Sequence, residues 1–94
     1  MAKRVFLLTG ISQKGKEKQS LIQAMESATV EEIAFALSMA AMEMIKTDQA
    51  KFFSINNWED EKTIIPGYSK EELLSLEHLV FVYLSKMVAD GFVL

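Results

Sequence analysis

The chain has 94 residues, half of them apolar and 24% charged, with a net charge of −3 at neutral pH. This length fits one domain over residues 1–94, and this composition excludes a disordered chain. The chain has no cysteine, which excludes disulfides and thiolate metal sites, and its single histidine excludes a histidine-rich metal centre. We therefore expect no metal and no cofactor.

The basic residues and the apolar runs bear on the partner and the compartment. Arg4 is the one arginine among ten basic residues, and arginine is the side chain that matches phosphate bidentately. Nucleic acid is therefore disfavoured as a partner. The N-terminal apolar run is too short for a signal peptide, and no run is long enough to span a bilayer. We expect a cytoplasmic protein without membrane contact.

The first two elements are a strand and a short helix. Residues 4–9, RVFLLT, form a brief apolar run that stops at Gly10, which predicts a strand. A polar loop follows. Residues 17–26 then place Leu21, Ile22 and Met25 at helical spacing, which predicts an amphipathic helix.

The central element is a long helix over residues 29–46. Thr29 and Glu32 have the spacing of a capping box, in which each side chain bonds the backbone of the other. Strong helix formers follow, without glycine or proline. Apolar residues occupy roughly 220° of the circumference, which is more than one neighbouring element covers.

The second half of the chain predicts two strands and a last helix. Apolar residues at 52–55 and 63–65 flank a polar segment and suit a hairpin. Ser69 and Glu72 form a second capping box, which begins a helix over residues 69–89. The predicted fold is therefore α+β and mostly helical, with three helices and a small sheet.

Two of the predicted helices, 29–46 and 69–89, are apolar over more than half of their surface. A contiguous apolar patch of several hundred Å2 usually marks a protein contact, and a two-fold dimer is the simplest way to cover it. We therefore predict a homodimer. The predicted contact residues are Phe35, Met39, Met42, Leu79, Phe81 and Val82.

The loop from Gly10 to Lys16 matches the G-x-x-x-x-G-K core of a phosphate-binding loop. Glu17, however, stands where such loops have Ser or Thr, and its carboxylate would repel phosphate. Weak anion binding near a predicted helix N-terminus stays open. The candidate anion-binding residues are Lys14, Gly15, Lys16 and Lys18. Phosphate or nucleotide binding is thus the second alternative function.

A DNA-binding function is the first alternative. Residues 29–38 resemble the first helix and turn of a helix-turn-helix, and the predicted element order is similar to that of winged-helix transcriptional regulators. This resemblance implies that residues 39–46 would be the recognition helix. That segment, MAAMEMIK, has no Arg, Asn or Gln to contact base edges. A single continuous helix over 29–46 fits the sequence better.

Trp58 lies in the polar segment NNWEDEK, where it either anchors a partner or folds over the sheet edge. No residue pattern predicts a catalytic site, and we expect a protein that is not an enzyme. The sequence thus favours a small regulatory or protein–protein interaction protein that self-associates through apolar helices. Its protein partner is not identified by the sequence.

Overall fold

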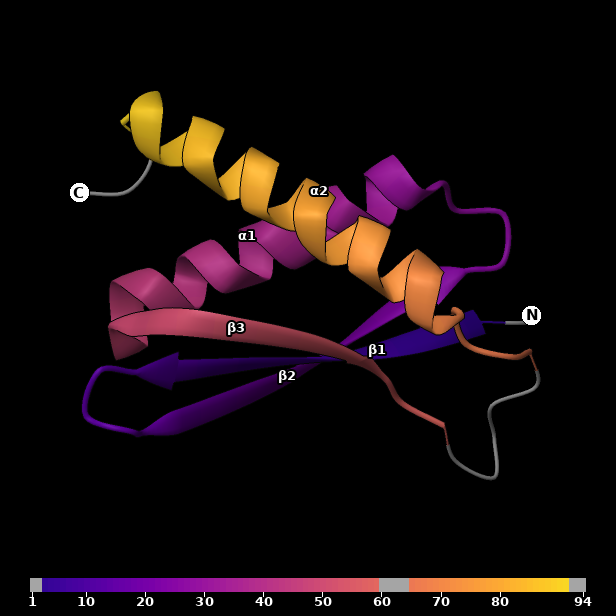
Figure 1. The fold of residues 1–94 in the computed structure, drawn as a ribbon, viewed down its shortest axis with the longest axis horizontal. Helices are drawn as coiled ribbons and strands as arrows, with labels where there is room; N and C mark the ends of the chain where they lie inside the picture. Colours follow the sequence, from indigo (N-terminus) through magenta and orange to yellow (C-terminus); the bar gives the residue numbers. More distant parts are fainter. Residues whose placement is uncertain (1–2, 60–64, 92–94) are drawn as a thin grey trace.

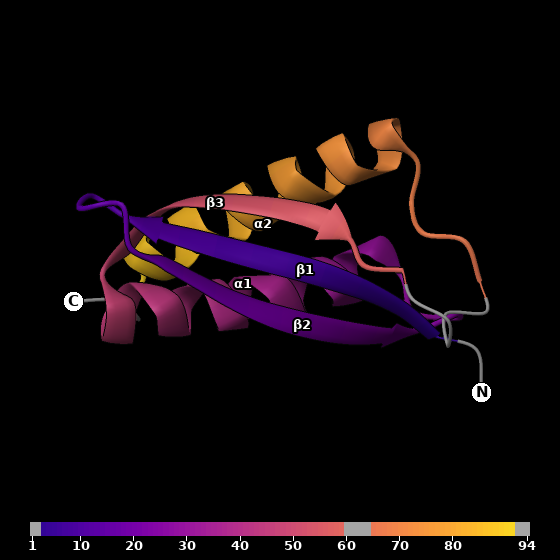
Figure 2. The same ribbon diagram turned by 90° about the horizontal axis from the view of Figure 1, so that it is seen from below.

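A computed structural model describes residues 3–59 and 65–91 of the chain. The elements in chain order are β1 (Lys3–Ser12), β2 (Glu17–Met25), α1 (Val30–Asp48), β3 (Ala50–Asn57) and α2 (Lys70–Ala89). The strands form an antiparallel sheet in the order β2-β1-β3. Both helices lie on the same face of this sheet (Figure 1, and from below in Figure 2).

This architecture corrects the predicted mostly helical fold. The described residues form an α+β fold with two helices and a three-stranded antiparallel sheet, 46% helix and 32% strand, so the prediction of three helices is wrong. The segment predicted as a helix over 17–26 is the strand β2, which pairs with β1 along its whole length. A short apolar run fits both the helical and the strand periodicity. Pairing with β1 therefore determined that this segment is a strand. The predicted strand near 63–65 falls mostly outside the described residues.

The capping box predicted for the central helix is confirmed. Thr29 donates its backbone N–H to Glu32 Oε1 (3.0 Å), and Glu32 donates its backbone N–H to Thr29 Oγ1 (3.1 Å). From this cap α1 continues without a break to Asp48, so the region contains one helix and no helix-turn-helix. The element order on which the winged-helix resemblance depended is therefore not present among the described elements.

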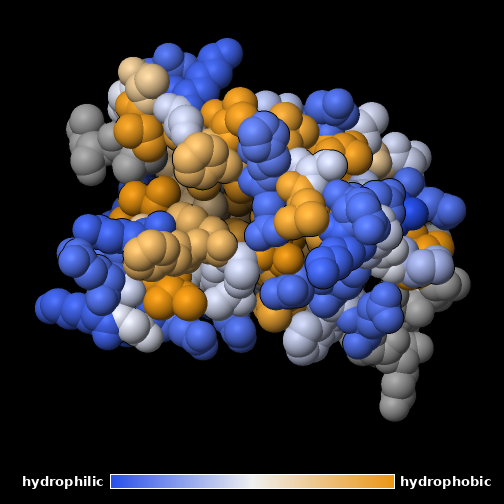
Figure 3. Space-filling view, in the orientation of Figure 1, coloured by the Kyte–Doolittle hydropathy of each residue, from blue (hydrophilic) through white to orange (hydrophobic). Residues whose placement is uncertain are grey.

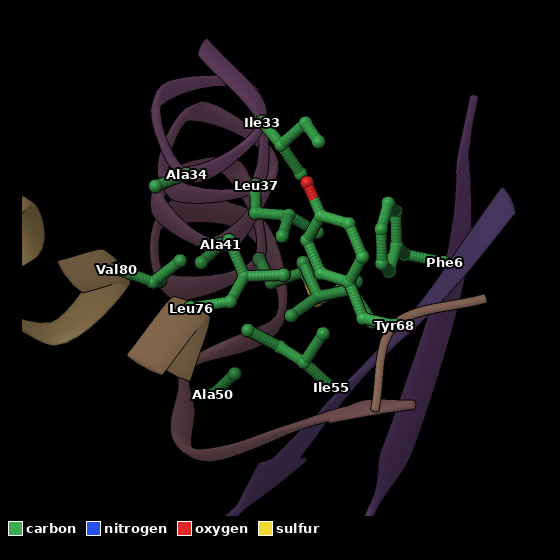
Figure 4. Packing of buried hydrophobic residues seen from close by; sticks show 12 residues of the cluster. Phe6, Ile33, Ala34, Leu37, Ala41, Ala50, Ile55, Tyr68, Leu76 and Val80 are labelled. Carbon is green, nitrogen blue, oxygen red and sulfur yellow. The ribbon is translucent and has the colours of Figure 1, made fainter. Parts of the chain in front are cut away.

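One hydrophobic core joins the sheet to both helices. Phe6 and Leu8 from β1 are buried within it. Ile33 and Leu37 from α1 and Leu76 from α2 are buried there too, and Figure 4 shows them around Phe6. Phe6 and Leu8 point to the same side of β1 because side chains alternate along a strand. This alternation places one face of the sheet against the helices.

The two helices cross where α1 carries small side chains. Ala34, Ser38 and Ala41 are completely buried, and the Ser38 hydroxyl donates to the carbonyl of Ala34 at 2.7 Å. The same hydroxyl lies 3.5 Å from the carbonyl of Val80 on α2. Small residues at this spacing let α2 approach α1 closely, so α2 packs mainly on α1 and only at its margin on β3.

The single arginine has a structural role. The Arg4 guanidinium donates to the carbonyl of Pro66 (3.2 Å) and lies 5.1 Å from the centre of the Tyr68 ring. The Tyr68 ring packs edge-on against Phe6, with 5.2 Å between ring centres (Figure 4). Burial raises the pKa of the Tyr68 hydroxyl, while the Arg4 charge acts in the opposite direction. These contacts hold residues 66–68, which precede α2, against the sheet.

Gly10 allows a close approach in the core. A Cβ atom at this position would lie 2.8 Å from Met44 Sδ and 3.1 Å from Phe53 Cε1. Gly15 differs, because it adopts a positive φ of 85° in the turn between β1 and β2, where no atom lies within 4 Å of an added Cβ. Packing therefore requires glycine at position 10, and backbone conformation favours it at position 15.

The described residues, 3–59 and 65–91, contain no helix that combines the length and the apolar character required to cross a membrane.

The Thr29→Ala variant tests the helix cap. Losing the hydroxyl leaves the Glu32 N–H without its acceptor, so the free energy of unfolding should fall by about 1 kcal/mol. Urea denaturation at neutral pH measures this change. Ser27→Ala, just before the cap, serves as the control and should leave the free energy unchanged.

The same cap predicts a pH dependence. Hydrogen bonds from the Thr29 backbone and then from its hydroxyl lower the pKa of Glu32 below 4.5. A carboxyl whose pKa is lower in the folded state stabilises the fold above its unfolded-state pKa, and this stability disappears as the pH falls through the folded-state value. Wild type should therefore lose more stability on acidification than Glu32→Gln. Equal losses would contradict the assigned cap.

A pair of glycine variants tests the role of Gly10 in packing. Gly10→Ala should lower the free energy of unfolding by roughly 1–3 kcal/mol, because the new methyl group overpacks the contact with Met44. Gly15→Asn should cost less, since asparagine tolerates a positive φ. Thermal denaturation of both variants makes the comparison. A larger loss for Gly15→Asn would show that the turn conformation matters more than the packing.

Candidate interaction surface

The helix α2 is mostly uncovered. Only two of its 20 residues, Leu76 and Val80, are fully buried. Its exposed side chains include Leu74 (57% exposed), Phe81 (69%) and Val88 (52%). It is uncommon for several large apolar side chains on one helix to be this exposed. The outer side of α2 is therefore the first part of a candidate contact surface.

These three exposed residues form one stripe. Leu74, Phe81 and Val88 are seven positions apart, which is close to two helical turns, so they share a face of α2. Phe81 lies at the middle of this stripe. We call Leu74, Phe81 and Val88 the α2 stripe.

A groove lies between α2 and the sheet edge formed by β3. It encloses about 490 Å3, and its apolar lining comes from Phe52, Phe53 and Ile55 on β3 and from Phe81 and Leu84 on α2. Figure 3 views the molecule from the side of β3 and shows apolar side chains gathered over β3 and α2 around a hollow. We call this hollow the β3–α2 groove.

A second groove lies on the other side of α2, between α2 and α1. It encloses about 450 Å3 and is almost entirely apolar. Its lining residues are Phe35, Met39, Met42, Tyr83, Lys86, Met87 and Asp90. The helix α2 is thus a ridge with an apolar groove on either side, and we call this one the α1–α2 groove.

The strand β3 has a free edge beside the first groove. The Trp58 N–H donates to the carbonyl of Val5 on β1 at 2.9 Å. Backbone N–H and C=O groups alternate in direction along an antiparallel strand. Those of Ser54 and Asn56 therefore also face β1. Those of Phe53 and Ile55 point away from β1. No described strand pairs with this outer side. The β3 edge therefore offers backbone hydrogen bonds next to an apolar groove.

The charges around the β3–α2 groove have both signs. Lys51 lies on β3, and Glu77 and His78 lie on α2 along the groove. Because β3 and α2 run in opposite directions (Figure 1), Lys51 is at the Leu84 end of the groove and Glu77 is at the Ile55 end. A positive and a negative group thus flank the apolar centre.

The sheet face opposite the helices is also uncovered by the described elements (Figure 2). Leu21 and Met25 on β2 are about half exposed there. Gln19, Gln23, Ser54 and Asn56 occupy the same face by strand alternation. These polar residues interrupt the apolar ones, so this face is a weaker candidate than the grooves.

The predicted contact residues divide between several places. Phe35 and Met39 are exposed in the α1–α2 groove, and Phe81 is exposed in the β3–α2 groove. Met42 lines the α1–α2 groove but is buried. Two further predicted residues differ from these: Leu79 packs partly buried against the core, and Val82 is exposed but lines neither groove.

The predicted anion-binding residues lie on a hairpin turn and its following strand. Gly15 donates its N–H to the carbonyl of Ser12, and Lys16 donates its N–H to the Ser12 hydroxyl. These N–H groups are therefore used inside the turn. Lys14 and Lys16 line a hollow of about 680 Å3 at this end of the molecule, while Lys18 does not. The expected helix after the loop is the strand β2, so the helix N-terminus predicted to follow these lysines is absent there.

Trp58 directly follows β3 and is 41% exposed. Its backbone is fixed to Val5, which holds the residue beside the sheet. It lines none of the hollows described above. Within residues 3–59 and 65–91, no group of three His, Asp or Glu side chains is arranged to hold a metal ion.

Sequence reasoning missed the part of the surface that comes from β3. The residues concerned are Phe52 and Phe53, together with the backbone edge beside them. It also missed Leu74 on α2, although its spacing from Phe81 was visible in the sequence. The edge itself depends on strand order, which the sequence pattern did not give.

Comparisons with protein-family models, with curated proteins and with solved structures found no match to this chain.

Proposed function

We propose that this protein is a small protein–protein interaction module that self-associates through α2 and the grooves beside it, without a catalytic role. The observation that carries this proposal is the exposure of the α2 stripe on a helix with only two buried residues. A helix needs an apolar contact on at least one face to be held in place. The inner face of α2 has this contact through Leu76 and Val80, and a second protein surface would cover the apolar stripe on its outer face.

The free energy available from burying the exposed apolar side chains supports this proposal. Burying a Phe, Leu or Val side chain stabilises a protein by roughly 1.5–3 kcal/mol. Phe81, Leu74 and Phe52 are each more than half exposed. Covering the exposed parts of all three would contribute roughly 3–6 kcal/mol per copy, which is near the lower end of the stability of a whole small domain, roughly 5–15 kcal/mol. Association would therefore remove a large amount of apolar surface from water.

The two alternative functions receive less support from the geometry. Arg4 already contacts Pro66 and Tyr68, so it is committed to the fold. In the turn at residues 13–16, the N–H groups of Gly15 and Lys16 bond to Ser12. Neither feature is arranged to bind a phosphate group, whether free or in a nucleic acid. The apolar grooves, in contrast, suit a protein surface.

Light scattering coupled to size exclusion tests the proposal. The wild-type protein should have about twice the mass of one 10.6 kDa chain. A double variant with one change in each groove, Phe35→Ser and Phe81→Ser, should be a single chain. Because both side chains are exposed, the variant should keep its helical circular dichroism.

Leu21→Ser is the matched control, since Leu21 is an exposed apolar residue on the opposite face of the sheet. It should leave the mass of the assembly unchanged. A wild-type protein that stays a single chain at high concentration would contradict self-association.

A further inference from the structure

We infer that two copies of this chain join through their β3 edges, forming a continuous six-stranded sheet with one α2 stripe packed against the other. This inference rests on the proposed self-association and specifies its geometry. The occupant of the β3–α2 groove is then the same groove of a second copy, related by a two-fold axis.

The first argument is the unpaired edge of β3. Phe53 and Ile55 direct their backbone groups outward, as the Trp58–Val5 hydrogen bond and strand alternation imply. An apolar edge of this kind is a template for another strand, and folded proteins usually protect it with charged residues. β3 has one charged residue, Lys51, in the sequence AKFFSINN. The centre of the strand, residues 52–55, carries no charge that would oppose pairing.

The other free edge of the sheet differs. The strand β2 begins with Glu17 and Lys18, and Gln19 and Gln23 are exposed along it. A charged and polar edge strand resists pairing with another chain. β2 thus carries two charged residues and β3 carries one, so β3 is the better suited of the two edges.

The second argument is the position of the centre of symmetry. Phe81 is the middle residue of the α2 stripe and lies in the same groove as Phe53, near the middle of β3. A two-fold axis that passes near these two residues would pair the β3 strands antiparallel. The same rotation would place Leu74 against Val88 of the second copy and Phe81 against its own counterpart.

The third argument is charge. Lys51 and Glu77 lie at opposite ends of the β3–α2 groove. A two-fold rotation exchanges these ends, so Lys51 of one copy would face Glu77 of the other. Each contact would occur twice, as it does in any isologous interface. A parallel arrangement of the two grooves would instead place Lys51 near Lys51.

These three arguments favour a second copy over an unrelated protein. One rotation pairs the strand edges, matches the α2 stripes and opposes unlike charges. The groove is therefore complementary to itself. A peptide from another protein would use the strand edge but would leave most of the α2 stripe exposed.

The chain has no cysteine. A single cysteine introduced by mutation can therefore carry a spin label, and the distance between the labels of two copies can be measured. Ser54 is exposed at the middle of β3. A nitroxide on Ser54→Cys should report a short distance between copies, because paired strands lie about 4.8 Å apart. The control label on Gln23→Cys lies on β2, at the far edge of the same face. In the proposed sheet the two β2 strands are five strand spacings apart, or about 24 Å.

Variants separate this geometry from self-association itself. Phe81→Ser should raise the dimer dissociation constant at least about thirty-fold, as expected for a central contact residue. Phe35→Ser, a phenylalanine of similar exposure in the α1–α2 groove, should leave it unchanged. A dimer that tolerates Phe81→Ser and shows long Ser54 distances would overturn this geometry and leave the proposed function standing. A protein without any dimer would overturn both.

Discussion

The close crossing of α1 and α2 determines which surfaces of this protein stay uncovered. The small side chains of Ala34, Ser38 and Ala41 bring α2 onto α1 near Val80. Because α2 is held there, it lies beside β3 and covers little of the sheet. A larger side chain at Ser38 would push α2 away. The two grooves beside α2 follow from this packing contact, whereas the free β3 edge follows from the strand order β2-β1-β3.

The distribution of buried residues explains why we assign the surface to contact between proteins. The core places Phe6, Leu8, Ile33 and Leu37 between the sheet and α1. That layer is complete without the outer half of α2. The remaining apolar side chains of α2 therefore have no role in the interior, although exposing them to water is unfavourable. A second surface that covers them would stabilise the helix and the assembly together.

Local signals made the helices predictable from the sequence. The pairs Thr29–Glu32 and Ser69–Glu72 both form capping boxes in the structure, within one residue of the predicted helix starts. A capping box involves residues three positions apart, so it can be recognised without knowing the fold. The same local reasoning selected both Phe81, which is exposed, and Leu79, which packs partly buried against the core, so it did not separate the two sides of α2.

The features that the sequence did not predict depend on contacts between residues that are distant in the chain. β2 carries Leu21, Ile22 and Met25 at positions that suit a helix, but pairing with β1 makes it a strand. Ser38 is a polar residue, yet it is completely buried because α2 crosses α1 there. The free edge of β3 is a property of strand order, which no local pattern contains.

Amide hydrogen exchange along β3 tests the central claim, that this edge is a contact between copies, most directly. Ser54 and Asn56 direct their N–H groups toward β1, so they serve as internal controls for Phe53 and Ile55, which direct theirs away. We predict that the Phe53 and Ile55 amides are protected at high protein concentration and lose this protection on dilution. Rapid exchange of both amides at every concentration, with Ser54 and Asn56 still protected, would contradict the account.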